Sequence, residues 1–220
     1  MKSIAQLIVC TLALCGSQLF AQTPNGIVKT TELSPVRLMP ETPPVGLQKL
    51  FSNLGTKWPY YDGTIGWALG GPNASTPEFV AMAFVSPVDA DVTQVRIPLM
   101  YVAGTNQINI SLYSGPSGPR GTPKTLIAGP VTVTNLPAYG TCCLLTVVKF
   151  SPTPIVAGAQ YWVVADTPSS GPGSDFDGSW DWVPPVPPPG DSFSSPAGSP
   201  WFAGRSRIEA AAGEVFGTIP

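Results

Sequence analysis

The sequence predicts an all-β fold, an antiparallel two-sheet β-sandwich that is jelly-roll-like and has almost no helix outside an N-terminal leader. Short β-rich runs recur along the chain, and Gly, Pro, Asn and Ser separate them. Several runs alternate apolar and polar residues with a period of two, the pattern of half-buried antiparallel strands. No stretch follows the 3.6-residue period of an amphipathic helix. Many short strands with frequent turn signals are typical of a sandwich.

The individual runs predict the strands in order. The alternation is clearest in residues 107–113, where Ile108, Ile110 and Leu112 share one face. The run Phe79–Val85 is apolar on both faces, which predicts a central strand. The other strong runs are residues 93–102, 126–133, 142–150 and 160–166, and the weaker ones are 64–69, 201–208 and 214–217.

The first 21 residues have the three parts of a secretory signal peptide. Lys2 supplies the positive start, residues 4–14 form the apolar centre, and Ala21 is the small residue before the expected cut. The apolar run is too short to span a bilayer. A lipoprotein signal with lipidation at Cys15 is the alternative, but Leu14 is not the small residue that such a box requires. We therefore expect secretion, to the extracellular space or the periplasm.

The remaining chain divides into two parts. Residues 22–47 contain five prolines and predict an extended N-terminal arm, and residues 48–218 predict the single sandwich domain. Within that domain, residues 167–200 are rich in Gly, Ser and Pro and predict a long loop. A loop of this length in a compact domain is usually functional or disordered.

Composition excludes several functions. Charged residues make up only 11% of the chain and no Lys/Arg cluster is present, which excludes a nucleic-acid binder with a basic face. The chain contains no histidine, so Ser-His-Asp catalysis and histidine zinc sites are excluded. We expect no membrane association after signal cleavage, and the sequence does not define an oligomeric state.

Two adjacent cysteines remain after signal cleavage, Cys142 and Cys143. Their Cα atoms lie about 3.8 Å apart, shorter than the usual disulfide span. In a strand they would point to opposite faces. This geometry favours two unpaired thiols, and a vicinal disulfide in a strained turn is the alternative.

A cluster of carboxylates is the one candidate metal site. Asp175, Asp177 and Asp181 lie within seven residues around a glycine, and their oxygens suit Ca²⁺. A solvated Asp/Gly turn is the commoner explanation of such a segment. Calcium is the only cofactor that the sequence suggests.

Two aromatic groups are candidates for ligand binding. Trp180 and Trp182, with Asp181 between them, would stack on a sugar ring if exposed, while Tyr60 and Tyr61 form a second cluster of the same kind. The alternative is a Trp pair buried at the open end of the sandwich, since large aromatics are mostly buried.

A series of short motifs resembles a known family. In chain order they are residues 50–55 (LFSNLG), 66–71 (GWALGG), 110–113 (ISLY), 136–140 (LPAYG), 157–164 (AGAQYWVV) and 215–218 (VFGT). Their order is similar to that in bacterial secreted choice-of-anchor domain proteins, many of which carry a PEP-CTERM sorting signal. The resemblance implies an extracellular β-sandwich and no catalytic residues. This chain ends at Pro220 without an apolar tail, so we expect free secretion instead of a surface anchor.

These observations favour a noncatalytic secreted module for binding or adhesion, with extracellular polysaccharide or other cell-surface material as its expected partner. One alternative is a carboxylate-dependent glycoside hydrolase. It would use Asp175 with Asp177, or Asp177 with Asp181, at the required separation of about 5–9.5 Å. Another alternative is a purely structural extracellular component that binds no small ligand.

Overall fold

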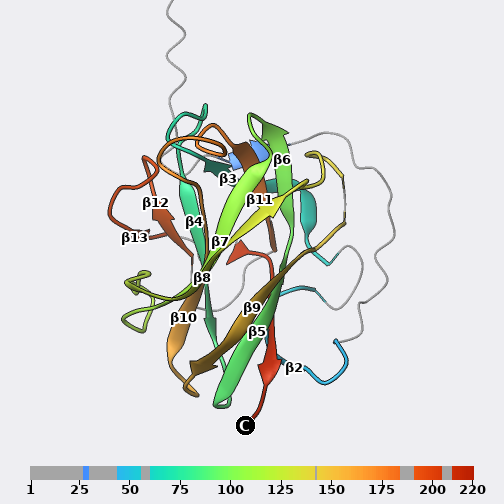
Figure 1. The fold of residues 1–220 in the computed structure, drawn as a ribbon, viewed down its shortest axis with the longest axis vertical. Coiled ribbons are helices and arrows are strands. Elements are labelled where there is room, and N and C mark those ends of the chain that lie inside the picture. Colours follow the sequence, from blue (N-terminus) through green and yellow to red (C-terminus); the bar gives the residue numbers. More distant parts are fainter. Residues whose placement is uncertain (1–26, 30–43, 56–59, 142, 184–190, 205–209) are drawn as a thin grey trace, which may run out of the picture.

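The computed structural model describes residues 27–29, 44–55, 60–141, 143–183, 191–204 and 210–220, the first of these by backbone alone. Its described part is all-β and contains no helix (Figure 1). Accordingly, no helix in this part has the length and apolarity to cross a bilayer. Antiparallel sheets pack face to face, which confirms the predicted sandwich class.

Backbone pairing divides the strands among three sheets. The six-stranded sheet has the order β13 (Phe202–Ala203), β12 (Ser192–Ser194), β4 (Phe79–Val85), β10 (Gln160–Asp166), β7 (Gln107–Ser114) and β8 (Thr125–Thr134). The five-stranded sheet has the order β1 (Ile27–Lys29), β3 (Asp62–Gly70), β11 (Asp177–Val183) and β14 (Ala210–Ala211), with β6 (Leu99–Ala103) also paired to β11. The four-stranded sheet has the order β2 (Gln48–Ser52), β15 (Glu214–Thr218), β5 (Ala90–Ile97) and β9 (Thr146–Ile155).

Proline accounts for the division between two of these sheets. Residues 93–102 read as one run in the sequence, but Pro98 separates β5 from β6. Proline has no N–H to donate to a ladder, so pairing stops there. The Pro98 carbonyl instead accepts a hydrogen bond from the Asp181 N–H, at 3.1 Å. The chain thus passes from the four-stranded sheet into the five-stranded sheet at this residue.

One main core lies between the six-stranded sheet and the other two. Alternate residues of each strand enter it, as the two-residue period requires. From β7 these are Ile108, Ile110 and Leu112, all fully buried as predicted. The run Phe79–Val85 is β4, which lies inside its sheet between β12 and β10 and is therefore the interior strand that its sequence indicated.

Two predictions about irregular segments are corrected. Part of the Pro-rich arm, Ile27–Lys29, forms β1 and pairs antiparallel with residues 65–67 of β3. Within the predicted loop of residues 167–200, Asp177–Val183 forms β11, an interior strand, and Ser192–Ser194 forms β12. The predicted signal peptide, including Cys10 and Cys15, lies outside the described residues.

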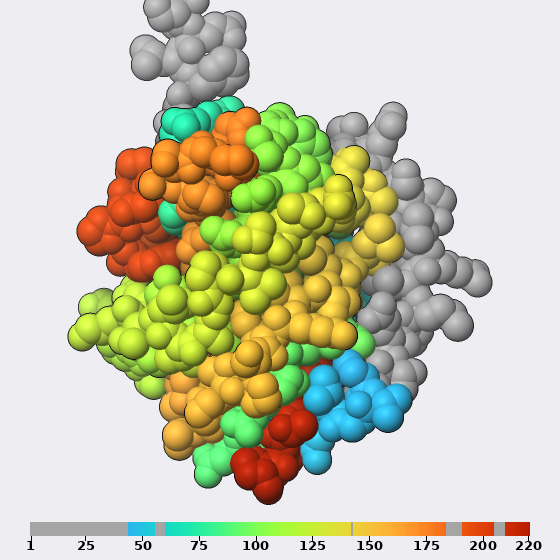
Figure 2. Space-filling view, viewed as in Figure 1, coloured from blue at the N-terminus to red at the C-terminus, as the bar shows by residue number. Residues whose placement is uncertain are grey.

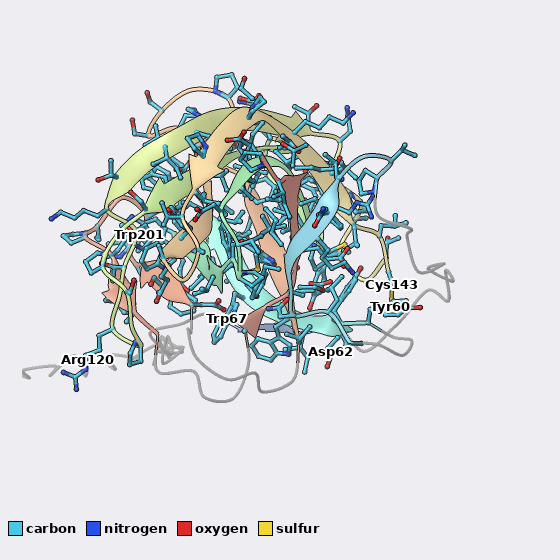
Figure 3. All side chains as sticks on the ribbon, turned by 90° about the horizontal axis from the view of Figure 1, so that it is seen from below. Tyr60, Asp62, Trp67, Arg120, Cys143 and Trp201 are labelled. Carbon is cyan, nitrogen blue, oxygen red and sulfur yellow. The ribbon has the colours of Figure 1, made fainter. Side chains whose placement is uncertain are left out.

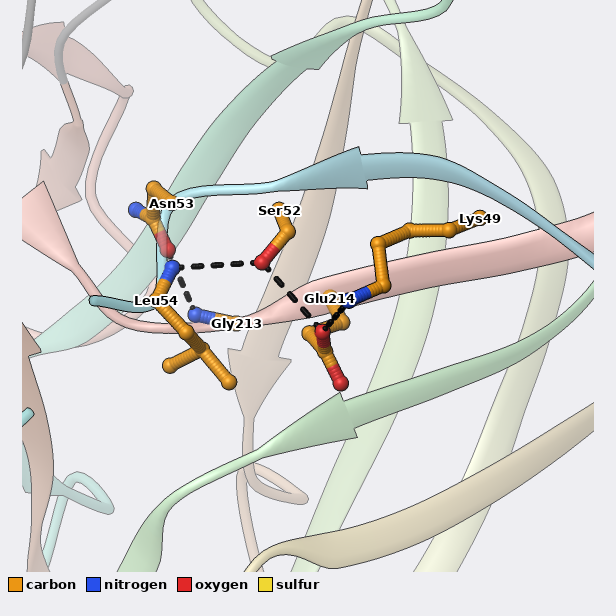
Figure 4. Close-up of polar contacts among 6 residues, drawn as sticks. All are labelled: Lys49, Ser52, Asn53, Leu54, Gly213 and Glu214. Carbon is orange, nitrogen blue, oxygen red and sulfur yellow. Dashed lines mark hydrogen bonds and ion pairs between the residues drawn. The ribbon is translucent and has the colours of Figure 1, made fainter. Parts of the chain in front are cut away.

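Polar contacts fix β2 against the last strand (Figure 4). The Lys49 ammonium lies 2.5 Å from the Glu214 carboxylate. The Asn53 side chain accepts a hydrogen bond from the Gly213 N–H at 2.7 Å and donates one to the Ala211 carbonyl at 2.8 Å. The segment between β14 and β15 is therefore held by the Asn53 side chain, which lies near the start of the domain in the sequence.

A buried carboxylate connects the two layers. Asp191, just before β12 of the six-stranded sheet, accepts hydrogen bonds from the Trp67 indole N–H at 3.0 Å and the Ala211 N–H at 2.6 Å. Trp67 and Ala211 belong to β3 and β14 of the five-stranded sheet. Burial raises the pKa of Asp191 to about 7, although both hydrogen bonds act in the opposite direction.

Smaller clusters of buried residues lie outside the main core. One contains Trp162 and packs against Trp201, and the other contains Tyr61 and Cys143 and packs against Tyr60. Trp201 and the Tyr60–Cys143 pair lie on opposite sides of the sandwich (Figure 3). Both clusters are extra layers on the outer surfaces of sheets, and each brings polar side chains with it.

Candidate functional site: the outer face of the six-stranded sheet

Strand alternation gives the six-stranded sheet a second, outward surface, here called the outer face. In β10, Tyr161, Val163 and Ala165 enter the main core. The intervening side chains of β10 therefore point outward, and β7 contributes its own alternate positions to the same surface. The outer face is defined by Gln160, Trp162, Val164 and Asp166 of β10 and Asn109, Ser111 and Tyr113 of β7.

Aromatic rings cover the apolar part of the outer face. Trp162 and Val164 are fully buried there beside Ala81 and Ala83 of β4. Tyr113 and Trp201 pack against this cluster and remain half-buried. Tyr113 and Trp201, from different parts of the chain, are thus partly open to solvent and pack on a buried apolar cluster.

A polar row crosses three strands beside the rings. Thr132 of β8 donates a hydrogen bond from its hydroxyl to the Asn109 side-chain oxygen, at 3.0 Å. The Asn109 side chain in turn hydrogen-bonds the Asp166 carboxylate. Burial raises the pKa of Asp166 to about 6, and the bond from Asn109 acts in the opposite direction. The pKa of the Tyr113 phenol is also raised, mainly by burial and further by the nearby charge of Asp166.

The loop after β7 closes one end of the outer face. Its Gly118 N–H donates to the Gln160 side-chain oxygen at 2.8 Å, and its Gly121 carbonyl accepts from the Ser192 hydroxyl at 3.1 Å. Gly115 lies so close to the Trp162 ring that a Cβ there would be 2.9 Å from it. Figure 2 shows this loop as a projection at the edge of the molecule, next to the segment of residues 191–204.

Two buried donors on the outer face have no acceptor. The Trp162 indole N–H and the Gln160 side-chain NH₂ make no hydrogen bond in the described structure. A buried donor without a partner costs about 1–3 kcal/mol. These two donors lie beneath the surface, whereas the outer face itself combines half-open rings with a carboxylate and an amide, which is the composition of a site for a polar ligand with apolar faces.

The two tryptophans predicted to bind sugar are core residues. Trp180 is fully buried and Trp182 is 6% exposed. The Trp180 indole N–H donates to the Ala212 carbonyl at 2.8 Å, and Trp182 packs edge-to-face on Trp67 with ring centroids 5.0 Å apart. The sugar-stacking interpretation of this pair is corrected, because neither ring presents a face to solvent. The buried alternative describes their placement.

The tyrosines predicted as a second binding cluster lie on the other side of the sandwich. Tyr61 is 1% exposed and donates its hydroxyl hydrogen bond to the Leu144 carbonyl at 3.0 Å. Tyr60 is half-buried and packs against the same small cluster. Tyr61 also lies close to Asp181. Burial is the main cause that raises the pKa of the Tyr61 phenol, and the negative charge of Asp181 raises it further.

The three aspartates of the predicted calcium site do not converge. Asp177 and Asp181 lie four residues apart on β11, which corresponds to about 13 Å along a strand. Asp175 is exposed and accepts a hydrogen bond from the Thr105 N–H, Asp177 accepts one from the Ser75 hydroxyl, and Asp181 is fully buried. No group of three or more metal-ligating side chains occurs within the described ranges.

The same placement removes one predicted hydrolase pair. A retaining or inverting glycosidase needs two carboxyl groups about 5–9.5 Å apart on either side of its substrate. The Cα atoms of Asp177 and Asp181 lie about 13 Å apart along β11, and Asp181 has no exposed surface that a substrate could reach. Asp175 and Asp177 are held by partners in two different loops, Thr105 and Ser75, which does not direct them at one bond.

Cys143 is a disulfide-bonded, fully buried residue. The prediction of two unpaired thiols is therefore wrong for Cys143. Cys10, Cys15 and Cys142 all lie outside the described residues. That prediction assumed that the two cysteines lie in a regular strand, where adjacent side chains point to opposite faces. Cys143 instead lies in a turn before β9 begins.

Two buried carboxyls lead us to expect that stability falls as pH rises from about 4 to about 7. The pKa values of Asp191 and Asp166 rise from 3.8 to about 7 and about 6 on folding. Between those limits the folded protein keeps protons that the unfolded chain has lost, so the free energy of unfolding decreases with pH. The slope is at most about 1.4 kcal/mol per pH unit for each proton.

Urea unfolding at pH 5.0 and pH 7.5 measures this effect. Asp191→Asn, which does not titrate, should flatten the dependence between these pH values. The shift of Asp175 has the opposite sign, but it acts at and below the ordinary pKa of 3.8 and therefore outside this window. Stability that increases from pH 5.0 to pH 7.5 would show that these carboxyls are ionised in the folded protein.

Comparison of the chain with family models, with curated proteins and with solved structures found no match. The resemblance to choice-of-anchor domain proteins therefore stays a prediction. The residues of the outer face were not among the sequence-predicted site residues. One signal for them was present, because Tyr113 is an aromatic residue on the polar side of the alternating run 107–113.

Proposed function

We propose that this protein is a noncatalytic secreted module that binds neutral polysaccharide through the outer face of its six-stranded sheet. The observation that carries the proposal is the placement of two half-buried rings, Tyr113 and Trp201, on one apolar cluster beside Asp166 and Asn109. Secretion rests on the signal-peptide pattern of residues 1–21 and on the resemblance to secreted choice-of-anchor proteins.

The chemistry of the outer face suits a sugar. Sugar rings have C–H surfaces that pack on aromatic faces, and a polar edge of hydroxyl groups that need hydrogen-bond partners. Tyr and Trp offer an apolar body with a polar tip, which is why they serve at surfaces that are partly apolar and partly wet. Asp166 and Asn109 lie on the same face, four residues along β10 and β7 from Trp162 and Tyr113, and offer acceptors there.

Charge narrows the class of sugar. The charged group that acts on the Tyr113 phenol is a carboxylate, Asp166. An anionic sugar such as a uronic acid would be repelled by it, whereas a neutral sugar donates hydroxyl hydrogen bonds to it. The proposal therefore specifies neutral glycans.

We expect Tyr113→Ala and Trp201→Ala each to weaken binding to a neutral polysaccharide by about tenfold, which corresponds to about 1.4 kcal/mol. Each substitution removes a half-exposed ring and leaves the main core intact. Affinity electrophoresis in gels containing β-glucan, xylan, mannan or polygalacturonate measures the effect. Polygalacturonate is the anionic comparison and should retard the protein least.

Phe202→Ala is the matched control. Phe202 follows Trp201 and is exposed, but its ring packs toward Phe193 of the main core, with centroids 6.0 Å apart. It should leave binding unchanged. Binding that survives both Tyr113→Ala and Trp201→Ala would place the site elsewhere, and no retardation by any glycan would favour a structural component. Release of reducing ends from any of the glycans would favour a hydrolase.

A further inference from the structure

A second group of polar residues lies on the outer surface of the five-stranded sheet. Trp180 and Trp182 of β11 point into the main core, so Ser179 and Asp181 between and beside them point to the other surface. The Ser179 hydroxyl donates to Asp181 Oδ1 at 3.1 Å. Asp181 Oδ2 is buried and has no hydrogen-bond partner among the described residues.

The neighbouring strand brings a second carboxylate to the same place. In the pairing of β3 with β11, Gly66 lies opposite Asp181 and Asp62 lies opposite Trp182, with a bulge between these two positions. Gly66 allows the close approach, because a Cβ there would be 3.0 Å from Asp181 Oδ1 and 2.8 Å from the Trp180 carbonyl oxygen. Asp62 accepts two hydrogen bonds from Thr64 on one oxygen, Oδ1.

The groups that surround Asp62 and Asp181 are hydroxyl and carbonyl oxygens, and no Lys or Arg side chain of the described residues is among those that act on Asp181. The Tyr139 hydroxyl donates to the Thr64 carbonyl at 3.3 Å, and the hydroxyls of Thr64 and Ser179 contact the two carboxylates directly. The negative charge of Asp62 acts on Asp181, where burial is the main cause of a raised pKa and the charge of Asp62 adds to it. Asp62 is only half-buried, so the pair is in contact with solvent.

A buried carboxylate with a free oxygen beside a second carboxylate needs a positive charge or a proton. Carboxylate and hydroxyl oxygens are the ligands of hard cations, and Ca²⁺ accepts six to eight oxygens in flexible arrangements that include water. We propose that Asp62 and Asp181 together bind one Ca²⁺ ion on the outer surface of the five-stranded sheet. The site replaces the predicted Asp175–Asp177–Asp181 set, retains Asp181, and is independent of glycan binding on the opposite face.

Thermal unfolding with CaCl₂ or with EDTA tests the site. A ligand that binds only the folded state at a hundred times its Kd raises Tm by roughly 5–10 °C for a domain of this size. We expect a shift of that order in millimolar CaCl₂, lost in Asp62→Asn and in Asp181→Asn. The matched control is Asp177→Asn on the same strand, which should keep the full shift.

A spectroscopic measurement separates binding from stability. Tb³⁺ substitutes for Ca²⁺ and emits when nearby aromatic rings are excited. Tyr61 and Tyr139 are such rings, because both lie close enough to Asp181 for its charge to raise the pKa of their phenols. Emission displaced by Ca²⁺, and absent in Asp62→Asn, is the expected result. Because Asp62 is half-buried, this variant remains informative if Asp181→Asn does not fold.

The outcomes decide between an ion and a proton at Asp181. A Ca²⁺-dependent Tm shift and Tb³⁺ emission that both require Asp62 and Asp181 support the site. Equal Tm values in CaCl₂ and EDTA, without Tb³⁺ emission, overturn it and leave Asp181 protonated. A shift that persists in Asp62→Asn and Asp181→Asn, or that disappears in Asp177→Asn, also overturns it.

Discussion

Trp180→Ala is expected to lower the free energy of unfolding by about 3–5 kcal/mol, the usual cost of truncating a large aromatic side chain in a core. Trp180 is fully buried in the main core, on an interior strand of the five-stranded sheet. The truncation leaves a cavity, and it also leaves the Ala212 carbonyl without the indole donor that it has at 2.8 Å. Urea unfolding monitored by far-UV circular dichroism measures the change.

Two further variants separate the causes. Trp180→Phe fills most of the cavity but cannot donate the hydrogen bond, so its cost should lie well below that of Trp180→Ala. Phe202→Ala removes a ring that is 38% exposed and should change stability by less than either. A Trp180→Ala protein of normal stability that no longer binds glycan would contradict the buried role and restore the sugar-stacking interpretation.

Asp191→Ala is expected to destabilise the protein by roughly 2–6 kcal/mol. Asp191 Oδ2 is the acceptor for both the Trp67 indole N–H and the Ala211 N–H, and the alanine would leave these two donors unpaired. Each buried unsatisfied donor costs about 1–3 kcal/mol. Chemical denaturation at pH 5.0 is the appropriate measurement, because the carboxyl is protonated in the folded state at this pH.

The controls for Asp191 vary acceptor and burial separately. Asp191→Asn keeps an acceptor oxygen and should lose less than half as much stability as Asp191→Ala. Asp89→Ala removes a carboxylate that also accepts a backbone N–H bond, from Ala157 at 2.7 Å, but at an exposed position. Water can satisfy the freed donor there, so we expect a small effect. Equal losses in Asp191→Ala and Asp89→Ala would contradict the account.

The strands with strong runs of apolar or alternating residues were predictable from local sequence. Residues 79–85 and 160–166 coincide with β4 and β10, and residues 107–113 with all but the last residue of β7. β11 was missed because its sequence, DGSWDWV, contains Asp, Gly and Ser, which favour turns. The protein buries six of these seven residues, including Ser179 and Asp181, and this burial outweighs their local preference for turns.

The candidate sites depend on which strands become neighbours. Tyr113 and Trp201 are 88 positions apart in the printed sequence and pack on one cluster because β4 and β10 lie between β12 and β7. Asp62 and Asp181 meet because β3 pairs with β11. A short local pattern contains no information about these pairings. The site residues predicted from the sequence were therefore aspartates and tryptophans that lie close together in the chain.

The pairing of the last strands determines when the fold can form. β11 to β15 supply strands to all three sheets. Among the described strands β2 pairs only with β15, which places Ser52 beside Glu214, 162 residues later. β6 has β11 as its only strand partner among the described elements. A growing chain therefore leaves β2 and β6 without partners until its last fifth has been made. Long-range pairing of this kind slows folding, so the four-stranded and five-stranded sheets cannot be completed until the end of the chain has been synthesised.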